Sequence, residues 1–206
     1  MTKLDYKKDL KELYLPKAEP TLITIPPMNF IMVNGTGAPQ DTGYQTAVGL
    51  LYALSYTIKM KGTPLPGYFD YAVFPLEGLW WTNTPVTNLD NRGSWLWTAM
   101  IRQPDFVTPE VFTWATELTQ KKKPQLDFSR ARLERFDEGP CVQMMHLGPY
   151  SDEPQTIERL HTFIKQQNLC VDTGPTRKHH EIYLSDPNKC APQKLRTTLR
   201  LPVSKQ

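Results

Sequence analysis

The nine residues from His179 to Pro187, H-H-E-I-Y-L-S-D-P, have the alternating pattern of a β-strand that ends in a turn. Because successive side chains of a strand point to opposite faces, Glu181 and Tyr183 project from the same face. Ile182 lies on the opposite face, which we expect to pack into a core. The Ser-Asp-Pro that follows favours a turn, since proline has no amide hydrogen to give to a sheet. The stretch therefore places a carboxylate and a phenol side by side, unless it is an ordinary amphipathic strand whose polar face meets water.

The composition is typical of a soluble globular protein: 39% of the 206 residues are hydrophobic and 22% are charged. The net charge of +3 is too small to indicate nucleic-acid binding. No stretch approaches the length of a membrane span, and the N-terminus lacks the apolar run of a signal peptide. The three cysteines and four histidines do not have the spacing of a metal site. We therefore expect a cytoplasmic protein that uses no metal or cofactor and contacts neither membrane nor nucleic acid directly.

A pattern of strand, glycine- and proline-containing turn, helix, strand and strand occurs twice along the chain. We expect the first repeat at residues 21–104 and the second at 127–203, with a connecting helix at 105–126 and an N-terminal arm at 1–20. This pattern predicts an α+β protein with two antiparallel sheets, each backed by its helix and related by a pseudo-twofold axis. We expect a single domain, 1–206, with a central aromatic cleft between the sheet faces that the helices leave uncovered.

Individual elements are predicted from periodicity and from turn residues. Apolar residues at helical spacing predict a helix that ends near Gly62, a second helix at 108–122 and a third at 152–167. Residues 68–74 are predicted to form a strand, which passes a bend or bulge at 75–78 and continues at 79–81. Further strands are expected at 21–33, interrupted by two prolines, and at 94–102, 141–147 and 195–203.

Four of the five tryptophans lie between residues 80 and 97, and they are candidates for the lining of the cleft. An apolar, aromatic pocket with a few converging polar groups is typical of a small-molecule site. The alternative is that the indole rings fill a core, as large aromatic side chains usually do. The motifs W-W and W-L-W place indole rings on both faces of a strand, and this favours a ligand surface because one face alone can be core. The candidate ligand-binding residues are Glu77, Trp80, Trp81, Trp95, Trp97, His146, Tyr150 and Glu181, with Tyr183 beside them.

Glu153 opens the helix predicted at 152–167, within the motif G-P-Y-S-D-E-P. A carboxylate at this position is stabilised by the helix dipole and by exposed amides, so a capping role is one explanation. The functional alternative is that the start of the helix opens onto the cleft, where Glu153 would orient and deprotonate a water molecule.

Four motifs of the chain occur together in one known family: L-D-Y-K-K-D-L at 4–10, P-L-E-G-L-W-W at 75–81, H-L-G-P-Y-S-D-E-P at 146–154 and H-H-E-I-Y-L-S-D-P at 179–187. By these motifs, and over nearly its whole length, the chain resembles the GyrI-like small-molecule-binding family, which has a fold of the SHS2 dyad type that also occurs attached to AraC- and MerR-type regulators. The likeness is closest to stand-alone members that hydrolyse cyclopropanoid, DNA-alkylating natural products. By position, the resemblance implies Glu153 and Tyr183 as catalytic residues and Glu181 as the buried carboxylate with which related regulators recognise cationic ligands.

The implied reaction agrees with the chemistry of these side chains. A spiro-cyclopropane conjugated to a dienone opens when its distant carbonyl receives a strong hydrogen bond, which Tyr183 would donate. Glu153 would be the general base for a water aimed at the ring carbon, and an apolar pocket would raise the pKa of Glu153 toward neutrality. Two alternatives remain: a non-catalytic protein that sequesters flat hydrophobic, aromatic or cationic compounds, and, less favoured, a protein-binding module of the gyrase-inhibitor type.

Overall fold

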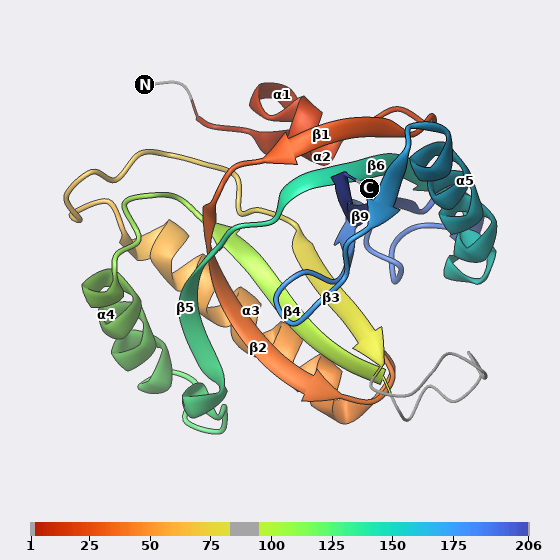
Figure 1. The fold of residues 1–206 in the computed structure, drawn as a ribbon. Helices are drawn as coiled ribbons and strands as arrows, with labels where there is room; N and C mark the ends of the chain where they lie inside the picture. Colours follow the sequence, from red (N-terminus) through yellow and green to blue (C-terminus); the bar gives the residue numbers. More distant parts are fainter. Residues whose placement is uncertain (1–2, 83–94, 206) are drawn as a thin grey trace. The chain divides into compact units, whose positions relative to one another are not determined.

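The computed structural model describes residues 3–82 and 95–205, and the chain divides into two compact units. Each unit has strands paired antiparallel together with helices, so the predicted α+β class is confirmed (Figure 1). The repeat boundaries, the pseudo-twofold axis and the cleft remain predictions. Unit 1 comprises Met1–Asp5 and Met28–Phe136, and unit 2 comprises Tyr6–Pro27 and Asp137–Gln206.

Among the described residues of unit 1, four strands pair antiparallel in the order β3-β4-β2-β5. Strand β2 begins directly after Pro26 and Pro27, and these two prolines separate it from the preceding strand as predicted. Strand β5 has no counterpart among the predicted strands. The bounds are β2 (Met28–Thr36), β3 (Leu76–Thr82), β4 (Trp95–Gln103) and β5 (Ala131–Phe136).

The strand predicted at residues 68–74 is wrong. Apart from one bridge between Leu4 and Tyr71, this stretch lies outside the sheet ladders. The ring of Tyr71 instead packs against that of Phe106, with 6.1 Å between centroids, so the aromatic content that suggested a strand reflects packing of a loop. The predicted bend at 75–78 is also wrong, because β3 already begins at Leu76.

Helix α3 (Thr42–Lys61) covers one face of this sheet and contacts β2 and β4 (Figure 1). It ends at Gly62, as its periodicity predicted. Gln103 of β4 donates a hydrogen bond of 3.0 Å from Nε2 to Oγ of Ser55 on the helix. Helix α4 (Pro109–Gln120) begins after Thr108, whose hydroxyl accepts the amide hydrogen of Val111, as expected for a helix with proline in its first turn.

Unit 2 contains strands in the order β1-β6-β9-β8, and β7 pairs with β9 at one end. Helix α5 (Glu153–Gln166) packs on one face of this sheet through Leu160 and Ile164, which contact Met144 and Leu199 in an apolar cluster. The bounds of the strands are β1 (Thr21–Ile25), β6 (Gly139–Leu147), β7 (Leu169–Val171), β8 (His179–Tyr183) and β9 (Arg196–Lys205).

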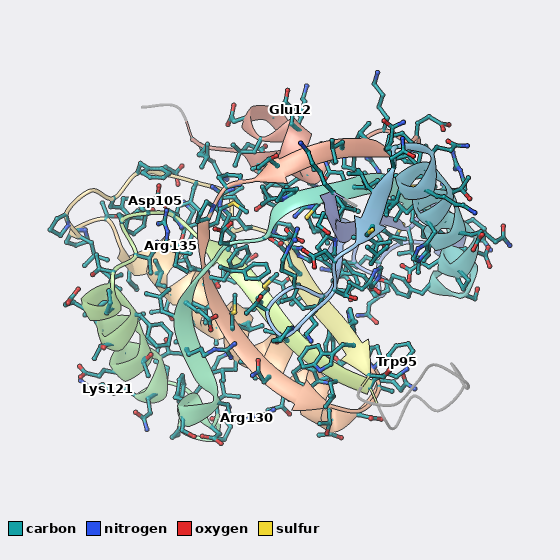
Figure 2. All side chains as sticks on the ribbon, in the orientation of Figure 1. Glu12, Trp95, Asp105, Lys121, Arg130 and Arg135 are labelled. Carbon is teal, nitrogen blue, oxygen red and sulfur yellow. The ribbon has the colours of Figure 1, made fainter. Side chains whose placement is uncertain are left out.

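The N-terminal segment attaches to the opposite face of this sheet through its backbone. The side chain of Gln143 donates to the carbonyl of Glu12 at 2.7 Å, and Arg200 donates to the carbonyl of Leu13 at 2.7 Å. Figure 2 labels Glu12 in this segment. The segment contains two short helices, α1 (Tyr6–Asp9) and α2 (Lys11–Tyr14). Elsewhere in the part of the chain that the structure describes, single 3₁₀ turns lie at Phe128–Arg130, Tyr150–Asp152 and Pro192–Lys194.

A buried ionic group also lies on this face of unit 2. Glu138 accepts a hydrogen bond from Arg200 at 2.7 Å, and its second oxygen lies 2.8 Å from Nδ1 of His180. Burial by itself would raise the pKa of Glu138, but the charges of Arg200 and His180 outweigh burial and hold the pKa at about 2. Glu138 is therefore an ionised, structural carboxylate. Among the described residues, no helix is long and apolar enough to cross a membrane.

Candidate functional site

Strand β8 places three polar side chains on one face. His179, Glu181 and Tyr183 alternate with His180 and Ile182, both of which are buried. Tyr183 donates a hydrogen bond of 2.8 Å from its hydroxyl to Oε2 of Glu181, and Nε2 of His179 lies 3.1 Å from Oε1. The expected pairing of a carboxylate and a phenol on one face is confirmed, and a histidine completes the row.

The row lies on the face of the unit 2 sheet that carries α5. Glu181 is the register partner of Leu199, and Leu199 packs against Leu160 of α5. We had expected Glu181 and Tyr183 on a sheet face free of helices, and for unit 2 this placement is wrong. The alternation of a strand shows which residues share a face, but it does not show which face receives the helix.

Glu153 is the first residue of α5 and is 8% exposed. Its Oε1 atom has no hydrogen-bond partner among the described residues, and Asp152, the N-cap residue, makes no capping bond with its side chain. Burial, and then the charge of Glu181, raise the pKa of Glu153 to about 9. An increase of this pKa toward neutrality was predicted. The increase is larger than predicted, because a pKa of about 9 lies well above pH 7, and Glu153 is therefore a neutral carboxylic acid at pH 7.

Tyr150 connects the start of α5 to β8. Its ring lies edge-on to that of Tyr183, with 6.1 Å between centroids. Burial, and then the charges of Glu153 and Glu181, raise the pKa of Tyr150 to about 12. The negative charge of Asp186, in the loop that follows β8, also raises the pKa of Tyr150. One group of acidic and phenolic side chains is therefore formed by three segments: the turn before α5, the first residue of α5, and strand β8.

His146 is buried next to the start of α5, and ligand contact by this residue remains a prediction. It is 3% exposed, and its Nε2 atom lies 3.1 Å from the carbonyl oxygen of Pro149. A carbonyl only accepts, so Nε2 carries the proton, and Nδ1 accepts from the hydroxyl of Thr156 at 2.8 Å. Gly148 makes the intervening turn with φ +127°, a conformation that other residues rarely adopt. His146 thus ties β6 to the turn and to α5, and so fixes the position of Glu153.

Three of the candidate tryptophans lie on the face of the unit 1 sheet that α3 covers. Trp80 and Trp97 are register partners, and Tyr44 of α3 packs against both rings at 5.4 and 5.0 Å. Trp97 has no exposed surface and is a core residue. Trp95, at the start of β4 (Figure 2), packs against Trp80 with 5.6 Å between the ring centroids. The expectation that these three rings occupy a helix-free face is wrong, because the core alternative applies on this side of the sheet.

Trp81 and Glu77 lie on the other face of the same sheet. Alternation along β3 places both side chains opposite to Trp80, and their register partners on β4 are Leu96 and Met100. Glu77 is 1% exposed, whereas Trp81 is partly exposed. Of the two adjacent tryptophans, Trp81 is therefore the one on the face opposite to α3, and ligand contact by Trp81 and Glu77 remains a prediction.

Sequence reasoning missed the role of His179, which was weighed only as a metal ligand. The signal was present in the i, i+2 spacing of H-x-E, which brings both side chains to one face of a strand. In the part of the chain that the structure describes, no three histidine, cysteine, aspartate or glutamate side chains are grouped so that they could hold a metal ion.

The fold and the site define an α+β protein with a buried acidic group at the start of a helix. The chain belongs to the GyrI-like small molecule binding domain family, whose model matches residues 18–204. No curated protein matches the chain.

Solved structures from Listeria innocua are similar over the full length. One, an uncharacterized conserved protein, is 54% identical with a TM-score of 0.93, and the match covers 98% of this chain and all of that one. A second, described as a hydrolase, is 53% identical with a TM-score of 0.90 and the same coverage. A further hydrolase structure from this organism is 52% identical, again with a TM-score of 0.90 and the same coverage.

Proposed function

We propose that this protein binds flat, hydrophobic small molecules and hydrolyses cyclopropanoid, DNA-alkylating electrophiles among them. The observation that carries the proposal is Glu153, a buried carboxyl group with a partnerless oxygen whose pKa burial and Glu181 raise to about 9. Such strongly shifted groups are concentrated at functional sites. The hydrolase description of a relative that is 53% identical supports a catalytic role.

In the proposed reaction, the Glu153–Glu181 pair handles the protons and Tyr183 stabilises the developing charge. Tyr183 turns its hydroxyl from Glu181 to the dienone carbonyl of the substrate, where negative charge develops as the ring opens. A carboxylate of the pair accepts a proton from the attacking water, a contribution of about 10²–10⁴-fold. The position of Glu153 in the sequence predicts that this residue accepts the proton. The reaction requires no metal or cofactor, and we place it in the cytoplasm, where free cysteines are stable.

Sequestration without catalysis is the second candidate, and the Glu153–Glu181 pair also favours it. A cationic ligand beside these two groups would relieve the repulsion that now keeps a proton on Glu153. The neighbouring rings of Tyr150 and Tyr183 would add cation–π contacts. In this case aromatic cations bind tightly and are released unchanged.

One experiment distinguishes the two candidates. The protein is incubated with an excess of a cyclopropanoid alkylator, and the water adduct is measured by mass spectrometry over time. Hydrolysis predicts more than one equivalent of adduct per protein, lost in Glu153→Gln and Tyr183→Phe. The matched controls are Glu158→Gln on the exposed side of α5 and Tyr56→Phe, which is 52% exposed on α3. Stoichiometric protection of the alkylator without a water adduct would contradict hydrolysis and leave sequestration.

A further inference from the structure

The two carboxyl groups of the site differ in their partners. Both oxygens of Glu181 have one, the hydroxyl of Tyr183 at 2.8 Å and Nε2 of His179 at 3.1 Å. Glu153 is buried, and its Oε1 atom has no partner among the described residues. Hydrogen-bond donors favour the charged form of a carboxyl group, whereas burial without donors favours its neutral form. The hydrogen bonds of Glu181 therefore suit it to accept a proton, whereas burial without a donor at Oε1 suits Glu153 to hold one.

We infer that the site divides acid and base between these two residues: Glu181 is the general base, Glu153 is the general acid, and His179 is a positioning residue that holds Glu181. The inference rests on the hydrolysis proposed above, and it makes Glu153 the general acid instead of the general base expected from its position in the sequence. An ionised carboxylate only accepts, so the ring nitrogen of His179 that faces it carries a hydrogen.

The proton inventory of this reaction balances. Glu181 takes a proton from water, whose oxygen forms a bond to the cyclopropane methylene carbon. The bond from that carbon to the spiro centre breaks, and its electron pair enters the dienone. The carbonyl oxygen accepts the proton of Glu153 and becomes a phenol. One water is consumed, and the pair again holds one proton, now on Glu181, from which it returns to Glu153 between turnovers.

His179 is needed because Tyr183 has a second task. When Tyr183 turns to the substrate carbonyl, Glu181 loses one of its two neighbours, and His179 keeps the carboxylate in place. Both side chains stand on the same strand face as Glu181, two residues to either side, so a single rigid element sets their geometry. Tyr150, on the turn before α5, also faces these carboxyl groups, and Asp186 and Cys190 in the loop after β8 act on its hydroxyl together with Glu153 and Glu181.

The dependence of turnover on pH tests the assignment of acid and base. With Glu153 as the acid, kcat/KM for a cyclopropanoid alkylator is level near pH 8 and falls tenfold per pH unit above about pH 9, where Glu153 loses its proton. A rate that instead rises tenfold per unit up to about pH 9 would identify Glu153 as the base and overturn the inference, while hydrolysis itself would stand. No turnover at any pH would overturn both.

Substitutions of His179 test its positioning role. Because Gln can still donate an N–H to Glu181 and Leu cannot, His179→Leu is expected to lower kcat at least tenfold with KM within about twofold, and His179→Gln to restore most of the rate. The matched control is His161→Leu on the exposed side of α5, which leaves both constants unchanged. Equal losses in the Leu and Gln variants, or a change in KM alone, would refute the role of His179. Thermal melting of each variant separates these effects from unfolding.

Discussion

Replacing Glu153 by glutamine is expected to stabilise the fold at neutral pH while it abolishes turnover. Burial, and then the charge of Glu181, raise the pKa of Glu153 from its ordinary value of 4.5 to about 9 in the folded chain. Between these two values the unfolded chain releases a proton that the folded chain retains, so the free energy of unfolding decreases as the pH rises. Glutamine has nearly the same shape and no proton to release, and the substitution therefore removes this dependence.

The magnitude follows from the two pKa values. Each pH unit within the window lowers the free energy of unfolding by about 1.4 kcal/mol, which amounts to about 3 kcal/mol between pH 4.5 and pH 7. Glu153→Gln should therefore exceed the wild type by about 3 kcal/mol at pH 7 and match it near pH 4.5.

Urea denaturation at several pH values between 4.5 and 8, followed by tryptophan fluorescence, measures this difference. The control is Glu158→Gln, an exposed position on the same helix, for which no pH-dependent difference is expected. A constant offset between Glu153→Gln and the wild type at all pH values, or a wild type that gains stability as the pH rises, would refute the reasoning.

Three further predictions concern the framework of the two units. Glu138→Gln leaves Arg200 buried without its anionic partner and should lower the free energy of unfolding, measured by urea titration, by about 3–5 kcal/mol. The control Glu134→Gln removes a partly exposed ion pair and should change this free energy by less than about 1 kcal/mol. The pKa of Glu138 lies at about 2, so its contribution to stability is complete above pH 4.5 and is lost as the pH falls toward 2; circular dichroism of acid unfolding should show this loss in the wild type and not in Glu138→Gln. Gly35→Ala places a Cβ 2.2 Å from the ring of Trp97 and should lower the free energy of unfolding, measured by heat or urea, by about 1–3 kcal/mol. Gly49→Ala has open space around it on α3 and should raise this free energy by up to about 1 kcal/mol. Equal effects of the two substitutions would contradict the close packing of Gly35 against Trp97.

Local patterns were sufficient to predict most elements. Pro26 and Pro27 separate two strands, Gly62 ends α3, and alternation along β8 brings Glu181 and Tyr183 together. In each case the cause acts between near neighbours in the sequence. Residues 68–74 show where such reasoning fails, because an aromatic stretch has the same composition whether it pairs in a sheet or packs in a loop.

The site was predicted less completely because its properties depend on distant neighbours. No periodicity indicates that α3 would cover Trp80 and Trp97 rather than the face of Trp81. The pKa of Glu153 depends on burial and on Glu181, which is far away in the sequence, so its direction was predictable and its size was not. Similarly, the buried ion pair between Glu138 and Arg200 leaves no local signature.

The protonation of Glu153 is the central claim of this account, and carbon-13 NMR of the protein labelled at its glutamate carboxyl groups measures it directly. The account predicts one carboxyl resonance that titrates near pH 9 and disappears in Glu153→Gln. A spectrum in which every glutamate resonance titrates below pH 6 would contradict it.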